Sequence, residues 1–376
     1  MFGAKSAALM AVAAGLACRS AASPAVDAGR AGLPVPSEIV SLMKAANGWQ
    51  LSHMETLEEE HDWERGTWYT GVMAAYQSTG DRAYLDQATR WGQERKWGPG
   101  IATEGANVLT CPQAYMEVFF ASRDRSYIEP TIKWLDSGRK NTPSGAKYWY
   151  FSESRYVDSL YVGAPTLAML AKATGDPRYL TWMNAFFWDV HRELFDPDIG
   201  LFYRDKRFIR QVNPNGKRIL WSRGNGWAFA SLPRILTYLP AGDPNRAAYV
   251  ALLKQMAEAL AKRQQPDGFW RANLDDPKEF PMPETSGTGF FCYGLAWGIR
   301  SGALDRDAYL PSVTRAWRAL AASVSPEGKV QWGQNVGDRP EAVKKGDTRE
   351  YVTGTFLLAG SEMLRLAQGG AGTKGR

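Results

Sequence analysis

Seven consecutive residues, 221–227 (WSRGNGW), carry side chains suited to chemistry on a sugar acid. Trp221 and Trp227 could stack on the apolar face of a sugar ring, and Arg223 could hold a carboxylate through two hydrogen bonds. Asn225 offers an amide for a hydroxyl, and the two glycines let the backbone approach a ligand closely. The alternative is a helix start with two core tryptophans. An Arg and an Asn beside two glycines favour the first interpretation, because a core helix has little use for them.

Two other segments place a carboxylate just before an apolar helix. The aromatic-rich segment 140–157 leads to Asp158, and PMPETSGTG brings Glu284, Ser286 and Thr288 to the start of another helix. Either carboxylate could be a simple helix N-cap. Asp158 could instead work as an acid, and the group around Glu284 could recognise sugar hydroxyls. The residue types alone leave these alternatives open.

The composition agrees with a carbohydrate-active protein. Aromatic residues make up 12% of 376, and such rings either fill a large core or line a cleft that binds sugar rings. The net charge of +6 is spread along the chain without a Lys/Arg cluster. Nucleic acid is therefore excluded as a partner.

The N-terminus is typical of an export signal, because Lys5 precedes an apolar run that ends in small residues. We expect residues 1–22 to be this signal. Cys18 resembles the cysteine of a bacterial lipoprotein cleavage box, so the mature chain is expected in the periplasm or anchored to a membrane through a lipid. Ordinary cleavage near Ala22 is the alternative. Cys111 and Cys292 are expected to be buried free thiols, and no Cys/His cluster suggests a metal site.

Repeated helix hairpins indicate the architecture. A short turn containing Asp leads into an aromatic-marked helix at least five times, as in TGDRAYLDQATRW and TGDPRYLTWMNAFFWD. Asp suits an N-cap, and Pro177 or Pro244 suits the first helical position. The intervals are uneven, which favours a closed ring with long loops over an open solenoid. We predict an all-α (α/α)6 barrel formed by one domain over residues 36–367, followed by a disordered tail, 368–376.

Five motifs in order, VDSLYVGAP, LFYRD, WSRGNGW, DGFW and PETSGTG, resemble those of glycoside hydrolase family 105, which is related to family 88. The resemblance extends from about residue 43 to residue 366. It implies an (α/α)6 barrel that removes 4,5-unsaturated uronic acid from the non-reducing end of oligosaccharides produced by polysaccharide lyases. It implies neither a metal nor an organic cofactor.

The resemblance also assigns roles to individual residues. Asp158 stands at the position of the family's catalytic aspartate, which would protonate C4 of the unsaturated sugar and then activate the water that adds at C5. Arg223 becomes the candidate for the uronate carboxylate. Further candidate substrate-binding residues are Trp221, Trp227, Asn225, Glu284, Ser286, Thr288, Asn107, Gln113, Trp68 and Arg204.

The chain departs from the family pattern before its Gln-x-Tyr helix. Asn107 and Val108 stand where many relatives carry an acidic pair, and Glu104 or Glu117 are candidate replacements. A catalytically silent oligosaccharide-binding lipoprotein therefore stays open as an alternative. So does a conventional glycosidase that pairs Asp158 with Glu284. The motifs do not distinguish a galacturonyl from a glucuronyl substrate.

Overall fold

The computed structural model describes residues 1, 32–54, 62–100, 105–140 and 155–369. The predicted signal, Cys18, most of the aromatic segment 140–157, Glu104 and most of the predicted tail lie outside these ranges. The described helices are α2 (Pro36–Ser52), α3 (Asp62–Thr79), α4 (Arg82–Glu94), α5 (Thr110–Ser122), α6 (Glu129–Lys140), α7 (Ser159–Val162), α8 (Ala164–Thr174), α9 (Arg178–Leu194), α10 (Ser222–Tyr238), α11 (Arg246–Ala261), α12 (Thr285–Arg300), α13 (Arg306–Ala322) and α14 (Glu350–Ala367). Two short strands, β1 (Phe195–Asp196) and β2 (Leu201–Phe202), pair in antiparallel fashion.

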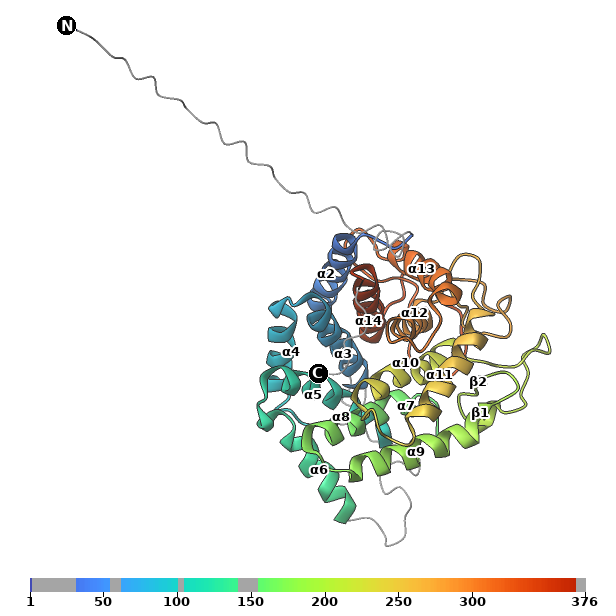
Figure 1. The fold of residues 1–376 in the computed structure, drawn as a ribbon. Helices are drawn as coiled ribbons and strands as arrows, with labels where there is room; N and C mark the ends of the chain where they lie inside the picture. Colours follow the sequence, from blue (N-terminus) through green and yellow to red (C-terminus); the bar gives the residue numbers. More distant parts are fainter. Residues whose placement is uncertain (2–31, 55–61, 101–104, 141–154, 370–376) are drawn as a thin grey trace.

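Alternate helices close into an inner ring. Around this ring α3 packs on α5, α5 on α8, α8 on α10, α10 on α12, α12 on α14, and α14 packs back on α3. The other long helices lie outside it, as Figure 1 shows for α4, α9, α11 and α13. The predicted (α/α)6 barrel is therefore confirmed.

The turns between helices largely follow the predicted capping. Asp81, Asp124 and Asp305 each accept a hydrogen bond from a backbone amide two or three residues later, at 3.1, 3.0 and 2.8 Å. The two prolines were placed wrongly. Pro177 is the residue before α9, and Pro244 stands two residues before α11, because each turn takes one or two more residues than the pattern suggested.

The ring closes where its first and last members, α3 and α14, cross. A Cβ at Gly71 would lie 2.4 Å from the Gly354 carbonyl oxygen, and a Cβ at Gly354 would lie 2.5 Å from that of Thr67. Only glycine permits this approach. At the amino end of the same pair, Arg65 binds Glu350 and Arg349 binds Glu64, each through two nitrogens, with both carboxylates buried.

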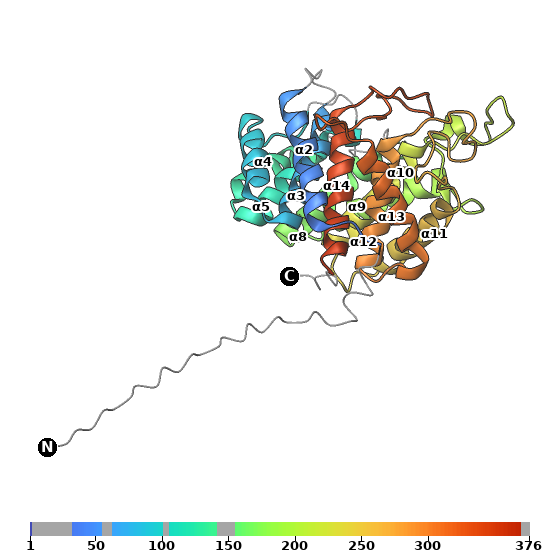
Figure 2. The same cartoon turned by 90° about the horizontal axis from the view of Figure 1, so that it is seen from above.

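The inner helices all run in the same direction, because an outer helix or connection returns the chain between them. Their amino ends therefore meet at one end of the barrel. Figure 2 shows the loop before α14 and the segment before α10 at this same end. Helix amino ends carry partial positive charge, so this rim favours anionic groups.

Both described cysteines, Cys111 and Cys292, are free and buried, which confirms that prediction. Over the described ranges, no helix has the length and apolar character needed to cross a membrane.

Candidate active site

Asp158 lies at this rim, immediately before α7. Its backbone is already helical and its side chain makes no capping hydrogen bond, so the N-cap interpretation is not supported. The neighbouring Val157 amide donates to the Arg204 carbonyl at 2.8 Å, which fixes the chain entering α7. The Asp158 side chain is 15% exposed and can therefore be reached from solvent.

Arg204 contacts the Asp158 carboxylate, and Tyr156 packs on Arg204. Arg204 Nε donates to Asp158 Oδ2 at 3.3 Å, and its guanidinium carbon lies 4.8 Å from the centroid of the Tyr156 ring. The Tyr156 hydroxyl in turn donates to Asn107 Oδ1 at 3.1 Å. The structure thus brings Asp158, Arg204 and Asn107, all predicted from sequence, into one connected group.

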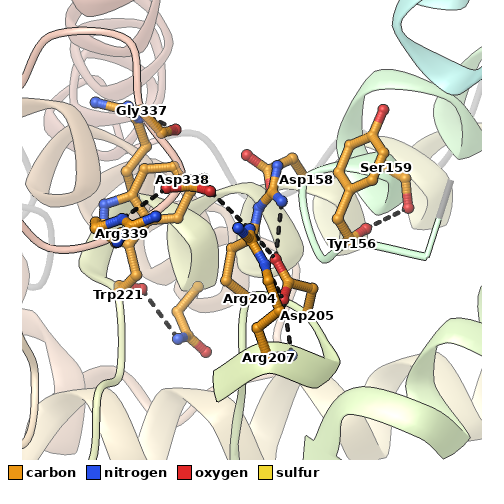
Figure 3. Close-up of polar contacts among 12 residues, drawn as sticks. Tyr156, Asp158, Ser159, Arg204, Asp205, Arg207, Trp221, Gly337, Asp338 and Arg339 are labelled. Carbon is orange, nitrogen blue, oxygen red and sulfur yellow. Dashed lines mark hydrogen bonds and ion pairs between the residues drawn. The ribbon is translucent and has the colours of Figure 1, made fainter. Parts of the chain in front are cut away.

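Alternating charges continue from Arg204 across the rim (Figure 3). Arg204 Nη1 binds Asp205 at 2.9 Å, Arg207 bridges Asp205 and Asp338 at 2.7 and 2.6 Å, and Arg339 binds Asp338 at 2.9 Å. The chain of ion pairs joins the segment after β2 to the loop that precedes α14. Sequence reasoning missed Asp205, Arg207, Asp338 and Arg339 as site neighbours. LFYRD was the only signal for Asp205, and the loop before α14 carries no motif.

The three carboxylates in this chain differ in proton affinity. Burial raises the pKa of the Asp158 carboxyl above its ordinary value, and the charge of Arg204 limits the rise. Burial acts to raise the pKa of Asp205 as well, but hydrogen bonds from Arg207 and Arg204 hold this pKa below the ordinary value. At Asp338 hydrogen bonds from Arg339 and Arg207 overcome desolvation and lower the pKa to about 2. Of the three, Asp158 is therefore the one suited to donate a proton near neutral pH.

The WSRGNGW segment forms the start of α10, and its tryptophans are buried. Trp221 is the residue before the helix, and its indole donates to Gln334 Oε1 at 2.9 Å. Trp227 packs in the aromatic core against Tyr161 and Phe290. The local structure is that of the alternative interpretation, a helix start with two core tryptophans. Stacking of either ring on a sugar stays a prediction.

Arg223 is only 1% exposed and is occupied by backbone carbonyls. Its Nη1 and Nη2 donate to the carbonyls of Gln334 and Asn335, both at 2.9 Å, and its guanidinium lies over the rings of Trp221 and Tyr351. This arrangement holds the loop before α14 against α10. Both terminal nitrogens are thus occupied, while Nε has no hydrogen-bond partner in the described part of the chain, and the predicted two-point grip on a substrate carboxylate stays a prediction.

Other predicted binding residues have structural partners instead. The Asn225 amide exchanges hydrogen bonds with both backbone groups of Phe202, at 2.8 and 2.9 Å, and also donates to the Trp221 carbonyl. Its polar atoms therefore hold β2 against α10, which speaks against the predicted hydroxyl contact.

Glu284 is buried and caps α12. Its carboxylate accepts from the amides of Ser286 and Gly287 at 2.7 and 2.8 Å and also from the Ser286 hydroxyl. Thr288 donates to the Glu284 carbonyl and accepts from the Trp270 amide. The capping interpretation therefore describes this group, and among the described residues no hydrogen bond joins it to Asp158.

Gln113, Glu117 and Trp68 lie deeper in the barrel. Gln113 bridges Arg234 and the Tyr161 carbonyl, and Glu117 pairs with Arg234, so neither substitutes for a missing acid at the rim. Trp68 is a core residue whose indole donates to Asn47. The partly exposed indole of α3 is Trp63, whose ring lies 5.4 Å from that of Tyr351. Sequence reasoning missed Trp63, although the two tryptophans are only five residues apart.

In the described part of the chain, no group of three or more His, Cys, Asp or Glu side chains could hold a metal ion.

Known proteins resemble this chain over nearly all of its barrel. The family model described as Glycosyl Hydrolase Family 88 matches residues 41–367. An unsaturated 3S-rhamnoglycuronyl hydrolase from Formosa agariphila is 33% identical over 88% of this chain and 92% of the relative. A protein of the same name from an Alteromonas species is 39% identical over 67% of this chain and 62% of the relative. The solved structure of a glycosyl hydrolase family 88 protein from Bacteroides vulgatus has a TM-score of 0.80 and 27% identity, covering 89% of this chain and 100% of that one.

Proposed function

Because the chain belongs to glycosyl hydrolase family 88, we propose that it removes the 4,5-unsaturated uronic acid at the non-reducing end of lyase-generated oligosaccharides. The observation that carries this proposal is the reachable carboxyl of Asp158, whose pKa is raised by burial while a cation contacts it directly. Such a group can hold a proton at the start of a reaction and be stabilised as a carboxylate after giving it away.

The unsaturated sugar is an enol ether, so its cleavage proceeds by hydration. Asp158 donates its proton to C4, and positive charge develops across C5 and the ring oxygen. The Asp158 carboxylate then takes a proton from the water that adds at C5. The resulting hemiketal collapses with ring opening and loss of the aglycone. One carboxyl group serves as acid and then as base.

The uronate carboxylate is attached to C5, next to the carbon that receives the proton. Its binding partner must therefore lie beside the acid. Arg204 meets this condition: its Nε contacts Asp158 and its Nη1 contacts Asp205, and its Nη2 has no partner among the described residues. Arg204 therefore takes the uronate role that the sequence analysis gave to Arg223.

The electrostatics of the rim support hydration over conventional two-carboxylate cleavage. A glycosidase of that kind needs a second free carboxylate facing the bond. Asp205 is committed to two arginines, Glu284 caps α12, and the position near Tyr156 carries the neutral Asn107.

We also propose that the sugar next to the unsaturated residue is rhamnose. The names of the two relatives, both rhamnoglycuronyl hydrolases, support this choice, and the word glycuronyl covers galacturonyl and glucuronyl residues alike. Arg207 and Arg339, with side chains 54% and 52% exposed beside the site, favour an aglycone that carries negative charge.

The test is a panel of lyase products with a rhamnose or another sugar next to the unsaturated residue, each with and without a sulfate ester. Turnover is followed by loss of the ultraviolet absorbance of the double bond. We expect an unsaturated uronyl substrate with rhamnose next to the unsaturated residue to react fastest. Saturable binding of every substrate without turnover would instead establish the silent binding protein.

Export is a second part of this proposal and rests on residues 1–22. We expect the mature chain to lack roughly its first 17–22 residues, because an apolar run followed by small residues is a signal. Mass spectrometry of the native protein measures the new terminus. A lipid-modified Cys18 would establish the membrane anchor, and an intact Met1 would contradict export.

A further inference from the structure

A cavity of about 440 Å³ lies at the end of the barrel opposite Asp158. Residues near the carboxyl ends of α3, α5, α10, α12 and α14 line it. They include Glu117, Arg234, Tyr293, Trp297 and Arg300. We call it the distal cavity. Its volume falls in the range of small-molecule sites in proteins, about 300–1,000 Å³.

A packed layer of aromatic rings separates the distal cavity from the rim. Tyr161, Trp227 and Phe290 meet with ring centroids 4.5–5.2 Å apart. None of these three lines the distal cavity, and none of the lining residues belongs to the group around Asp158. The two sites can therefore bind different molecules.

Charged side chains are buried at the distal cavity. Apolar side chains would close this end of the barrel at a lower cost in desolvation free energy. The side chains of Arg234 and Glu117 are each 3% exposed, and Arg234 Nη2 lies 3.2 Å from Glu117 Oε1. Arg300 and Arg365 both bind Glu362. A barrel end that served only packing would have little use for these groups.

Two polar groups at the distal cavity are incompletely partnered. Glu117 Oε1 accepts from Arg234 and Tyr238, whereas the buried Oε2 makes no hydrogen bond of full geometry, with the Gln77 side chain as its neighbouring donor. The Tyr293 hydroxyl has no partner in the described part of the chain. A buried acceptor without a donor costs about 1–3 kcal/mol, so a ligand that supplies donors would recover this energy.

The balance of charge points to a neutral ligand. Three arginines and two glutamates line the distal cavity, and the carboxyl ends of five helices add partial negative charge that offsets the excess cation. Hydroxyl groups can donate to Glu117 and accept from Tyr293, while Trp297 and Tyr238 offer apolar ring surface. We propose that the distal cavity is a second binding site, for a neutral sugar of monosaccharide size. This inference does not rest on the proposed function.

The experiment measures binding of L-rhamnose, D-glucose and D-glucuronate to the full chain by isothermal titration calorimetry and saturation-transfer NMR. The Asp158→Asn variant provides a background without turnover. We expect saturable binding of a neutral sugar that is unchanged by Asp158→Asn, and weaker binding of glucuronate.

Two variants locate the site. Tyr293→Phe removes a hydroxyl that has no internal partner, so the fold should persist and the dissociation constant should rise at least about fivefold, the equivalent of one hydrogen bond of about 1 kcal/mol. Ser78→Trp, at the edge of the cavity, should block binding and leave turnover intact. Tyr309→Phe on α13, away from the cavity, is the matched control and should bind like wild type.

Loss of neutral-sugar binding in Asp158→Asn, with normal binding in both cavity variants, would place the ligand at the rim and overturn the proposal. Absence of saturable neutral-sugar binding, or preferential binding of glucuronate, would also overturn it. Melting temperatures of the variants show whether a lost signal reflects unfolding.

Discussion

The chemistry of the rim depends on how differently the protein treats neighbouring carboxylates. Asp205 and Asp338 each receive hydrogen bonds from two arginines, which stabilise their ionised forms. Asp158 receives one long hydrogen bond, and burial dominates its proton affinity. The same residue type is therefore held ionised at two positions and is suited to donate a proton at the third.

Asp158→Asn should abolish turnover without loss of stability. The rate should fall by at least the ~10²–10⁴ typical of general acid–base groups, because both protonation and water activation are lost. The folded-state pKa of Asp158 lies above the unfolded value, so its ionisation at neutral pH opposes folding. The melting temperature of the Asn variant at pH 7 should thus equal or slightly exceed that of wild type. This difference should narrow as the pH falls toward the ordinary pKa of Asp.

Calorimetry and single-turnover kinetics of the same preparation check both parts. A melting temperature lowered by many degrees would give Asp158 a structural role, and normal turnover would move the chemistry to another carboxylate.

Arg204→Gln should move the alkaline limb of the plot of kcat/KM against pH to higher pH. The proposed reaction needs protonated Asp158 in the free enzyme, so activity should fall as pH rises through the pKa of Asp158. Arg204 lowers that pKa, and an opposite charge in contact is worth about 1–3 pH units. Without it the pKa rises, so the limb should shift upward by about one pH unit, together with a higher KM for the uronate.

Arg207→Gln is the matched control, because Arg207 contacts Asp205 and Asp338 and does not contact Asp158. Its alkaline limb should stay near that of wild type. A limb that stays in place, or moves to lower pH, in Arg204→Gln would show that Arg204 does not set the proton affinity of Asp158.

At the scale of single elements, the amino end of α12 shows why capping and chemistry are hard to separate in sequence. Glu284 precedes Ser and Gly, a pattern that suits both a cap and a sugar site, and the structure commits its two oxygens to backbone amides and the Ser286 hydroxyl. Asp158 also precedes a helix but makes no capping bond. The difference lies in backbone angles, which a residue pattern does not encode.

Glu284→Ala should lower the free energy of unfolding by about 2 kcal/mol, at the upper end of N-cap effects, because a buried cap leaves amides without acceptors. Glu284→Gln keeps one acceptor oxygen and should cost less. Urea unfolding measures both. A folded Glu284→Gln variant that loses turnover as completely as Asp158→Asn would revive the two-carboxylate mechanism.

The helices themselves could be predicted from sequence, because apolar spacing and Asp-containing turns are local. The contacts of the Arg223 side chain could not be predicted in this way. Its guanidinium is held by carbonyls of residues 334 and 335, more than a hundred positions along the chain, in a loop without a motif. Sequence assigned this arginine by its residue type, whereas long-range packing decides what it touches. For the same reason, the sequence did not predict that Arg204, Asp205 and Asp338 form one connected group.

At the scale of the whole molecule, ring closure depends on contacts between the first and last inner helices. The chain has no covalent link there, so α3 and α14 must be joined by packing and by the reciprocal ion pairs Arg65–Glu350 and Arg349–Glu64. The next residue, Tyr351, donates to the Gln334 carbonyl that also receives Arg223. Closure of the ring and support of the loop beside the site are therefore coupled.

Glu350→Ala should destabilise the protein by about 3 kcal/mol, because it breaks a buried ion pair and leaves Arg65 without that partner at a close helix crossing. The double variant with Arg65→Ala should lose less free energy of unfolding than the sum of the two single losses, since the two residues form one interaction. Urea unfolding of the single and double variants measures these losses.

Glu258→Ala, which removes an exposed ion pair with Lys262 on α11, is the control and should leave the unfolding midpoint nearly unchanged. If Glu350→Ala unfolds at the same urea concentration as Glu258→Ala, the ion pairs do not close the ring, and the glycine crossing of α3 and α14 carries that role alone.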